Sequence, residues 1–364
     1  MQPLPTSRGK IPRRQGKKQP KEGHPHREAG WRSSYLPPMI KTLLSCFFAS
    51  ALCLLPAGGH SWGFAAHRLI NRCAVFLLPP AMIGFYKRHI DWLTDHAVDP
   101  DKRRYAIADE GPRHFLDLDR YGPPPHRQLP RDWKAAVQAF GEDSLKRHGI
   151  LPWWVDRMQW RLTKAFQEMD TRSILQLSAE IGHYLSDGHV PLHACSNHNG
   201  QFTQQQGIHA FWESRIPERH GSQYDFVIPK AHYLTNPADY CWKRLFESAA
   251  AADSVLRIEK ELSQSLPADS RYAYEPRNGI VIRQYAARYT DAYHQRLGGM
   301  VERRMRQSIH TVASFWYTAW VDAGQPRLDT FTANPFTTAD RADWDSLDLR
   351  WRRDALRGRS CDAP

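Results

Sequence analysis

The stretch Gly-His-Tyr-Leu-Ser-Asp-Gly-His-Val-Pro-Leu-His-Ala, residues 182–194, decides how the fold of this chain is interpreted. His183 and Asp187 are four residues apart, and this spacing places an imidazole and a carboxylate on one face of a helix, one turn apart. Pro191 then ends the helical pattern, so that His193 can turn back towards the same space. The pattern predicts a helix that presents zinc ligands at its C-terminal end.

A second pair with the same spacing follows, in His-Ala-Phe-Trp-Glu, residues 209–213. Upstream, Asp99 and His114 fall in predicted loops, and His67 lies five residues after Trp62. Either helical pair alone is more often a surface ion pair or a satisfied core histidine than a metal site. The order of all these elements along one chain is what favours the metal interpretation.

Helical periodicity dominates the rest of the chain, and β-branched alternating runs are almost absent. The apolar spacing predicts helices over residues 64–78, 82–95, 132–147, 152–169, 173–188, 207–214, 236–265 and 281–322. The polar, turn-rich segments 96–130 and 195–207 are predicted as loops. We therefore expect an all-α fold, a single compact multi-helix domain over residues 62–326. Residues 327–364 are expected to form a polar C-terminal tail that is weakly ordered or packed along the surface.

The first 61 residues have a different composition. They contribute +8 of the formal net charge of +12, so the remainder is only mildly basic and gives no strong case for a polyanionic partner. Residues 1–38 are predicted to be disordered, and we expect translation to start at Met39. Residues 39–61 have the basic start, the apolar run and the small residues of a signal peptide. This predicts a secreted or periplasmic protein, with no integral membrane span, that begins at Trp62.

Four cysteines remain after this cleavage: Cys73, Cys195, Cys241 and Cys361. An oxidising compartment would allow one or two disulfides, but four cysteines have three pairings, and the sequence does not choose between them. It does not give the oligomeric state either.

The sequence resembles the superfamily of zinc-dependent phospholipases C and S1/P1 nucleases. The resemblance covers residues 62 to about 218 by motif, and the helical remainder is compatible with it. The stretch of residues 183–194 is specific, whereas the other motifs gain weight from their order. The motifs as they stand here are Trp-Gly-Phe-Ala-Ala-His (62–67), Ala-Val-Asp (97–99), His-Phe-Leu-Asp-Leu-Asp (114–119), the stretch 182–194 and His-Ala-Phe-Trp-Glu (209–213).

The resemblance implies three zinc ions and a particular set of ligands. One ion would be held by Asp99, His114, His183 and Asp187, and a second by His193, His209 and Glu213. The third would be held by His67, Asp187 and the α-amine and carbonyl of Trp62, which requires cleavage directly before Trp62. Asp99 would also accept a proton from the attacking water. The implied activity is hydrolysis of a phosphate ester by a hydroxide that bridges two zinc ions.

The substrate stays open between two enzyme classes. Glu213 stands where the nucleases typically have Asp, and the segment 194–208 lacks the Asp-x-Gly-Gly-Asn pattern typical of the nucleases, so a phospholipid is favoured and peripheral membrane contact is expected. The uncharged segment 63–66 does not favour a choline headgroup. The first alternative is a single-strand nuclease or 3′-nucleotidase with an aromatic base pocket. The second is a non-catalytic helical module that zinc stabilises.

Three further groups of side chains are weaker candidates for site residues. Lys102, Arg103 and Arg104 are candidates for phosphate contact, although a solvated cluster is the commoner interpretation. Side chains that could orient ligating imidazoles are Asp117, Asp119 and His189. Aromatic residues that qualify for base stacking by type alone are Trp153, Trp154, Phe202 and Phe211.

Overall fold

Helix α9 (Thr171–Asp187) lies at the centre of the helical assembly in the computed structural model, which describes residues 63–357 apart from 125, 127, 278 and 332–334. Nearly every residue from Ile174 to Asp187 is buried, as expected for a helix that is packed on all sides. The side chain of Asp170 accepts a hydrogen bond from the Ser173 backbone N–H at 3.1 Å and so caps the first turn.

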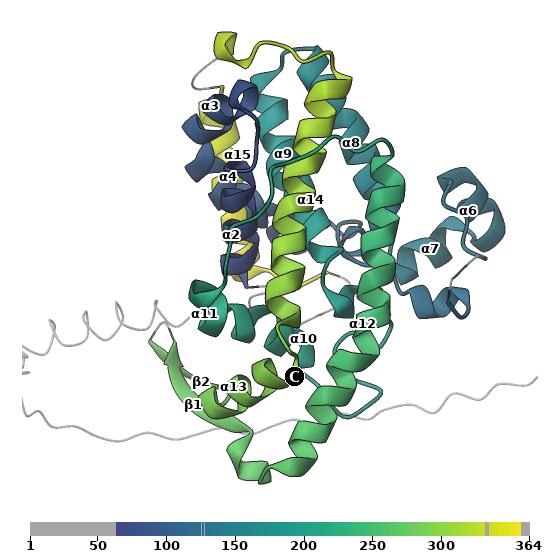
Figure 1. Cartoon of the computed structure of the whole chain (residues 1–364), viewed down its shortest axis with the longest axis vertical. Helices are drawn as coiled ribbons and strands as arrows, with labels where there is room; N and C mark the ends of the chain where they lie inside the picture. Colours follow the sequence, from purple (N-terminus) through teal and green to yellow (C-terminus); the bar gives the residue numbers. More distant parts are fainter. Residues whose placement is uncertain (1–62, 125, 127, 278, 332–334, 358–364) are drawn as a thin grey trace, which may run out of the picture. The chain divides into compact units, whose positions relative to one another are not determined.

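Three helices pack directly against α9: α2 (Phe64–Val75), α8 (Leu151–Gln167) and α14 (Met300–Asp322). Figure 1 shows α9 running between α2 and α8, with α14 crossing in front of it. The indole N–H of Trp316 on α14 donates to the Ser178 carbonyl at 3.0 Å, and Tyr86 from α3 shares a 2.9 Å hydrogen bond with the Ser178 hydroxyl. These bonds satisfy polar groups that the packing removes from water.

The other elements surround this centre and carry the connecting loops. The helices are α3 (Pro80–Arg88), α4 (Ile90–Asp95), α5 (Asp99–Arg103), α6 (Trp133–Phe140), α7 (Glu142–His148), α10 (Ile208–Ala210), α11 (Ile216–His220), α12 (Pro237–Ser265), α13 (Ala287–Arg296) and α15 (Thr338–Arg353). The 3-10 turns are η2 (His96–Val98), η3 (Gly111–His114), η4 (Leu118–Tyr121), η5 (Pro191–Ala194), η7 (Gly221–Gln223), η8 (Ala268–Ser270) and η9 (Leu328–Thr330), and η6 (Phe211–Arg215) is a π-helical turn.

The described residues are mostly helical, so the expectation of a mainly α fold is confirmed at that level. They include one antiparallel sheet, in which β1 (Tyr272–Arg277) pairs with β2 (Ile280–Tyr285). None of the described helices combines the length and apolar character needed to cross a membrane. Cys73 and Cys241 are free cysteines, whereas Cys361, like residues 1–62 with the predicted extension and signal peptide, lies outside the described residues.

Several predicted helix boundaries were wrong, and each error has a local cause. The segment 82–95 divides into α3 and α4 at His89, and the segment 132–147 divides into α6 and α7 at Gly141, which has a φ of +78°. The segment 281–322 begins with strand β2 instead of a helix. The C-terminal segment contains helix α15, which begins with a capping box between Thr337 and Asp340.

The approach of α2 to α9 depends on the absence of a side chain at Gly182. A Cβ atom there would lie 2.1 Å from Oδ1 of Asn71, which is fully buried on α2. The amide of Asn71 cannot easily move away, because its Nδ2 donates to the Ala179 carbonyl at 3.0 Å. This contact sets α2, and with it His67, at a fixed distance from α9.

Gly182→Ala is therefore expected to destabilise the protein by about 1–3 kcal/mol, the usual cost of overpacking a core. The measurement is the free energy of unfolding in urea. The matched control is Gly84→Ala on α3, where a Cβ atom meets nothing within 4 Å, so that the higher helix propensity of alanine should leave stability unchanged or raise it by about 1 kcal/mol. Equal stability of the two variants would contradict this description of the α2–α9 contact.

Candidate metal centre

Three groups of buried histidine and carboxylate side chains lie around the C-terminal end of α9, and each could hold a metal ion. Within each group, the candidate ligand atoms all lie within 4.8 Å of one another. Group A is His67, His183 and Asp187; group B is Asp101, His114 and His183; group C is His193, His209 and Glu213. Eight side chains distant in sequence therefore converge in one region of the fold.

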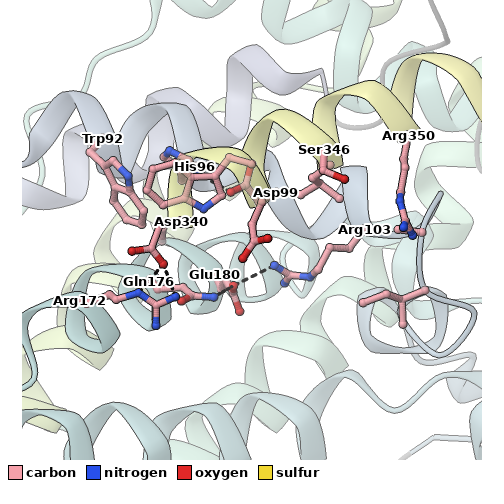
Figure 2. A pocket seen from close by; sticks show the side chains of 16 residues that line it. Trp92, His96, Asp99, Arg103, Arg172, Gln176, Glu180, Asp340, Ser346 and Arg350 are labelled. Carbon is pink, nitrogen blue, oxygen red and sulfur yellow. Dashed lines mark hydrogen bonds and ion pairs between the residues drawn. The ribbon is translucent and has the colours of Figure 1, made fainter. Parts of the chain in front are cut away.

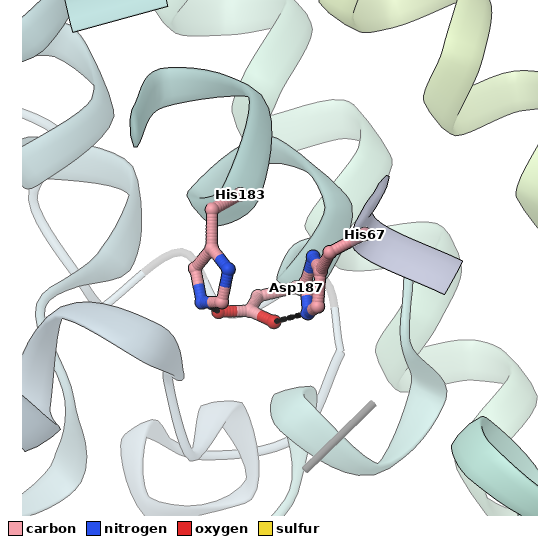
Figure 3. A group of neighbouring side chains, drawn as sticks. All are labelled: His67, His183 and Asp187. Carbon is pink, nitrogen blue, oxygen red and sulfur yellow. Dashed lines mark ion pairs between the residues drawn. The ribbon is translucent and has the colours of Figure 1, made fainter. Parts of the chain in front are cut away.

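The local structure explains how each ligand reaches this region. His183 and Asp187 lie one turn apart on α9, and Figure 3 shows both side chains directed towards His67 on α2. Pro191 opens the 3-10 turn η5, which follows the end of α9 and brings in His193. The ligands of group C on the next segment, His209 and Glu213, lie on the joined turns of α10 and η6, and the π-helical turn η6 begins between them.

Asp187 directs its two carboxylate oxygens towards different groups. Its Oδ1 lies 3.5 Å from Nε2 of His67, whereas its Oδ2 lies 2.9 Å from Nδ1 of His114 and 3.3 Å from Nε2 of His183. The rings of His67 and His183 stack with centroids 3.9 Å apart. A carboxylate in this position is suited to bridge two cations.

Group C fits a cation because of how its imidazoles are hydrogen-bonded. Nδ1 of His193 lies 2.5 Å from the His114 carbonyl, and Nδ1 of His209 lies 3.1 Å from the His198 carbonyl. A carbonyl oxygen can only accept, so each Nδ1 donates, and a ring that carries no second proton presents Nε2 as an acceptor. The two Nε2 atoms are 3.1 Å apart, and Oε2 of Glu213 is 3.3 and 3.0 Å from them. Three acceptors at these distances repel one another unless a cation or a proton lies between them.

The same arrangement fixes His183. Its Nδ1 donates to the Ala97 carbonyl at 2.9 Å, so its Nε2 faces groups A and B. Backbone partners of this kind hold the tautomer and orientation that metal binding needs.

The electrostatics of the region favour ionised carboxylates. Burial alone would raise the pKa of Glu213, but His209 and His193 outweigh burial and hold it at about 2. Burial would likewise raise the pKa of Asp187, yet His183 and His193 keep it well below its ordinary range. Burial and the neighbouring His183 lower the pKa of His67 to about 3, so this ring is neutral and able to bind a metal.

His183 has the opposite shift. Burial lowers its pKa, but Asp187 and Asp101 outweigh burial and raise the pKa to about 9. At pH 7 this ring therefore holds a proton that a metal must displace.

Metal binding is accordingly expected to release at least one proton per protein at pH 7 and to weaken as the pH falls below 9, because the raised pKa of His183 makes protons stronger competitors at lower pH. Calorimetric titration of the metal in two buffers of different ionisation enthalpy measures the number of protons. Identical heats in the two buffers would rule out this displacement.

The candidate group around His114 and His183 contains Asp101, whereas the sequence predicted Asp99 at this place. Oδ1 of Asp101 lies 3.8 Å from Nδ1 of His114 and 3.7 Å from Nε2 of His183. Asp99 instead lies 2.5 Å from Nδ1 of His96 and 3.3 Å from Nζ of Lys102. Two positions apart on a helix correspond to a rotation of about 200°, so α5 can direct only one of the two carboxylates at the group.

Asp99 lines a cavity of about 300 Å³ on the other side of α5, between α5, α9 and α15 (Figure 2). The predicted role of Asp99 as ligand and proton acceptor therefore has no geometric support. The sequence did contain a signal for Asp101, because the motif Asp-Pro-Asp, residues 99–101, offers a second carboxylate two residues after Asp99.

The remaining sequence candidates divide by location. Trp62 lies outside the described residues. Lys102 pairs with Asp99 and Asp348, Arg103 pairs with Glu110 and Glu180, and Arg104 lies 3.7 Å from Asp101. Arg104 is therefore the member of this basic cluster nearest to the ligands.

The side chains predicted to orient the imidazoles and most of the aromatic candidates instead stabilise the fold. Asp119 accepts hydrogen bonds from Ser196, Asp117 lies 3.6 Å from His148, and His189 contacts the Leu185 carbonyl and Thr311. Phe211 and Trp153 are core residues and Trp154 packs against the core, whereas Phe202 is 65% exposed on the loop between His193 and His209.

No family model matches this chain, and no curated protein matches it. The similarity to the superfamily therefore depends on the motifs alone, and a function for this protein must be inferred from the geometry of the three groups.

Asp101→Asn is expected to weaken metal binding in group B, because it removes a charged ligand from a buried site. A loss of about 10- to 100-fold in affinity is the usual size of such effects. Competition with a chelator of known affinity measures it. Asp99→Asn is the matched control two residues away and should leave the metal affinity within about threefold of wild type. If Asp99→Asn weakens metal binding and Asp101→Asn does not, Asp99 is the ligand, as the sequence predicted.

Proposed function

We propose that this protein is a secreted zinc phosphoesterase with three metal ions, similar to zinc-dependent phospholipases C. The observation that carries the proposal is the two-sided contact of Asp187, whose oxygens lie beside His67 on one side and beside His114 and His183 on the other. Paired metal sites joined by a shared ligand are typical of enzymes that hydrolyse phosphate esters.

Histidine and carboxylate ligands in groups of three suit zinc, which commonly keeps one coordination position open in catalytic sites. Zinc ions held here would lower the pKa of bound water and neutralise charge on the phosphoryl oxygens. The third ion would additionally require the α-amine of Trp62, and so cleavage of the signal peptide after Ser61.

The protein's own residues supply the proton acceptor. Oδ2 of Asp101 is buried and makes no hydrogen bond, while Oδ1 faces His114 and His183. In the proposed reaction this oxygen accepts a proton from the attacking water as the water oxygen bonds to phosphorus. The ester P–O bond breaks, and the leaving oxygen takes up the proton that Asp101 accepted, which returns the carboxylate to its starting state. A positioned base of this kind contributes about 10²- to 10⁴-fold to rate.

A phospholipid is the favoured substrate. Ala194 and Cys195, directly after the ligand His193, line a cavity of about 1190 Å³. Its other walls are largely apolar and include Phe246, Ala249 and three prolines. Walls of this character suit acyl chains better than a polyanionic strand. The exposed ring of Phe202 supports the alternative, a nuclease in which an aromatic side chain stacks on a base.

Mature protein is expected to contain about three zinc ions, to begin at Trp62, and to release a phosphorylated headgroup from lipid vesicles. The measurements are metal analysis, N-terminal sequencing and parallel assays with phospholipid, single-stranded nucleic acid and a nucleoside 3′-monophosphate. Release of nucleotide or inorganic phosphate would favour the nuclease. Full zinc occupancy without any hydrolysis would favour the alternative of a non-catalytic helical module that zinc stabilises. Absence of zinc from a chain that begins at Trp62 would refute the proposal.

Asp101→Asn is expected to lower kcat on the preferred substrate at least 100-fold at saturating zinc, because no other carboxylate of group B can take its proton. Asp99→Asn should retain activity within a few-fold. Saturating zinc separates loss of the proton acceptor from loss of the metal, and an active Asp101→Asn enzyme would exclude the assigned role.

A further inference from the structure

His114 faces its group in the opposite sense from the other histidines of groups B and C. His183, His193 and His209 donate Nδ1–H to backbone carbonyls and direct Nε2 inwards. His114 instead directs Nδ1 inwards, at 2.9 Å from Oδ2 of Asp187 and 3.1 Å from Nε2 of His183. Its outer nitrogen, Nε2, faces a side-chain carboxylate, because Oε1 of Glu110 lies 3.6 Å away.

Glu110 is completely buried, and its carboxylate is held from several sides. The hydroxyl of Tyr184 donates a short hydrogen bond to Oε1. Oε2 accepts from Arg113 at 2.6 Å and from Arg103 at 3.3 Å. Two guanidinium groups and a phenol therefore fix the position of this carboxylate before any metal binds, and a buried charge with such partners stays ionised.

We propose that Glu110 is a positioning residue that accepts the Nε2–H of His114 and so fixes Nδ1 of His114 as a metal ligand in group B. The inference rests on the metal centre of the proposed function, and no family motif quoted above contains Glu110. It adds to that function a carboxylate, Glu110, that would orient the metal-binding histidine His114 in group B.

A carboxylate does more than a carbonyl in this position. It has a full negative charge, so it increases the electron density that the opposite ring nitrogen offers to the cation. The separation of 3.6 Å is longer than a normal hydrogen bond, and such contacts tighten when the site is loaded. The local structure supports the pairing, since Glu110 directly precedes the 3-10 turn η3 and His114 is the last residue of that turn.

Arg103 offers a matched control, because it binds two carboxylates. Its Nη1 donates to Glu180 at 2.8 Å, and Glu180 also accepts from Gln176 at 3.1 Å. Glu180→Gln therefore disturbs the same arginine without removing the carboxylate that faces His114.

The test compares wild type, Glu110→Gln and Glu180→Gln in two measurements on the mature protein that begins at Trp62. Zinc is withdrawn by a chelator of known affinity, and the absorption spectrum of cobalt(II)-substituted protein is recorded. We expect Glu110→Gln to lose one zinc equivalent at a chelator strength 10- to 100-fold lower than wild type, and to change the cobalt bands of that one site. Glu180→Gln should follow wild type in both measurements.

Two results would overturn the assignment. The first is a zinc affinity and cobalt spectrum of Glu110→Gln that equal those of wild type. The second is an equal effect of Glu180→Gln, because it would show that the buried charge network matters and the contact to His114 does not. If Glu110→Gln does not fold, Glu110→Asp replaces it. That variant keeps the charge but withdraws it from His114, and it should show the same selective loss of one zinc equivalent; wild-type affinity would overturn the assignment. Wild type that binds zinc but hydrolyses no phosphoester would refute the proposed function and leave this inference standing.

Discussion

The close contact between Gly182 on α9 and Asn71 on α2 is the constraint on which the metal centre depends. A buried amide fills the space where a Cβ atom would be, and its hydrogen bond to the Ala179 carbonyl keeps it there. The two helices therefore approach closely one residue before His183, and the rings of His67 and His183 can stack. Group A and the two-sided position of Asp187 follow from this approach. A centre with candidate ligands on α2, α5, η3, η5 and the joined turns α10 and η6 needs one rigid reference, and α9 supplies it.

Burial of so many ionisable groups has an energetic consequence for the fold. An unpaired buried charge costs several kcal/mol, so the ionised carboxylates of Asp187 and Glu213 need cations close to them. Protons on histidines supply part of that charge, which is why the pKa of His183 rises although burial alone would lower it. Metal ions would supply the charge without breaking the hydrogen bonds that Nδ1 of His183, His193 and His209 makes to backbone carbonyls. Metal binding at these groups would therefore be coupled to folding, because the same side chains would carry both the buried charge and the ions.

The sequence predicted those parts of the molecule that local spacing determines. Helix α9 and its pair His183 and Asp187 follow from a four-residue repeat and a proline, and no distant contact is needed to recognise them in the sequence. The sheet at residues 272–285 was missed because β2 buries little and its apolar residues also fit a helical pattern. Helix α15 was missed because ion pairs hold it, such as Arg172 with Asp340 at 2.7 Å, and periodicity does not detect them. The start of α15 could have been predicted from the sequence, because Thr337 begins a capping box.

The choice between Asp99 and Asp101 could not be made from spacing, because it depends on what packs on each side of α5. Nζ of Lys102 lies 3.3 Å from Asp99 and 2.7 Å from Asp348 of α15, and His96 contacts both Asp99 and Trp344 of α15. Lys102, His96 and Asp99 are largely buried, so rotating Asp99 towards the metal groups would leave His96 without its carboxylate partner and Lys102 with Asp348 alone. Asp101 faces His114 and His183 and has an oxygen without a hydrogen bond. The two carboxylates of one short motif therefore have separate tasks, one attaching the C-terminal helix and the other completing the metal group.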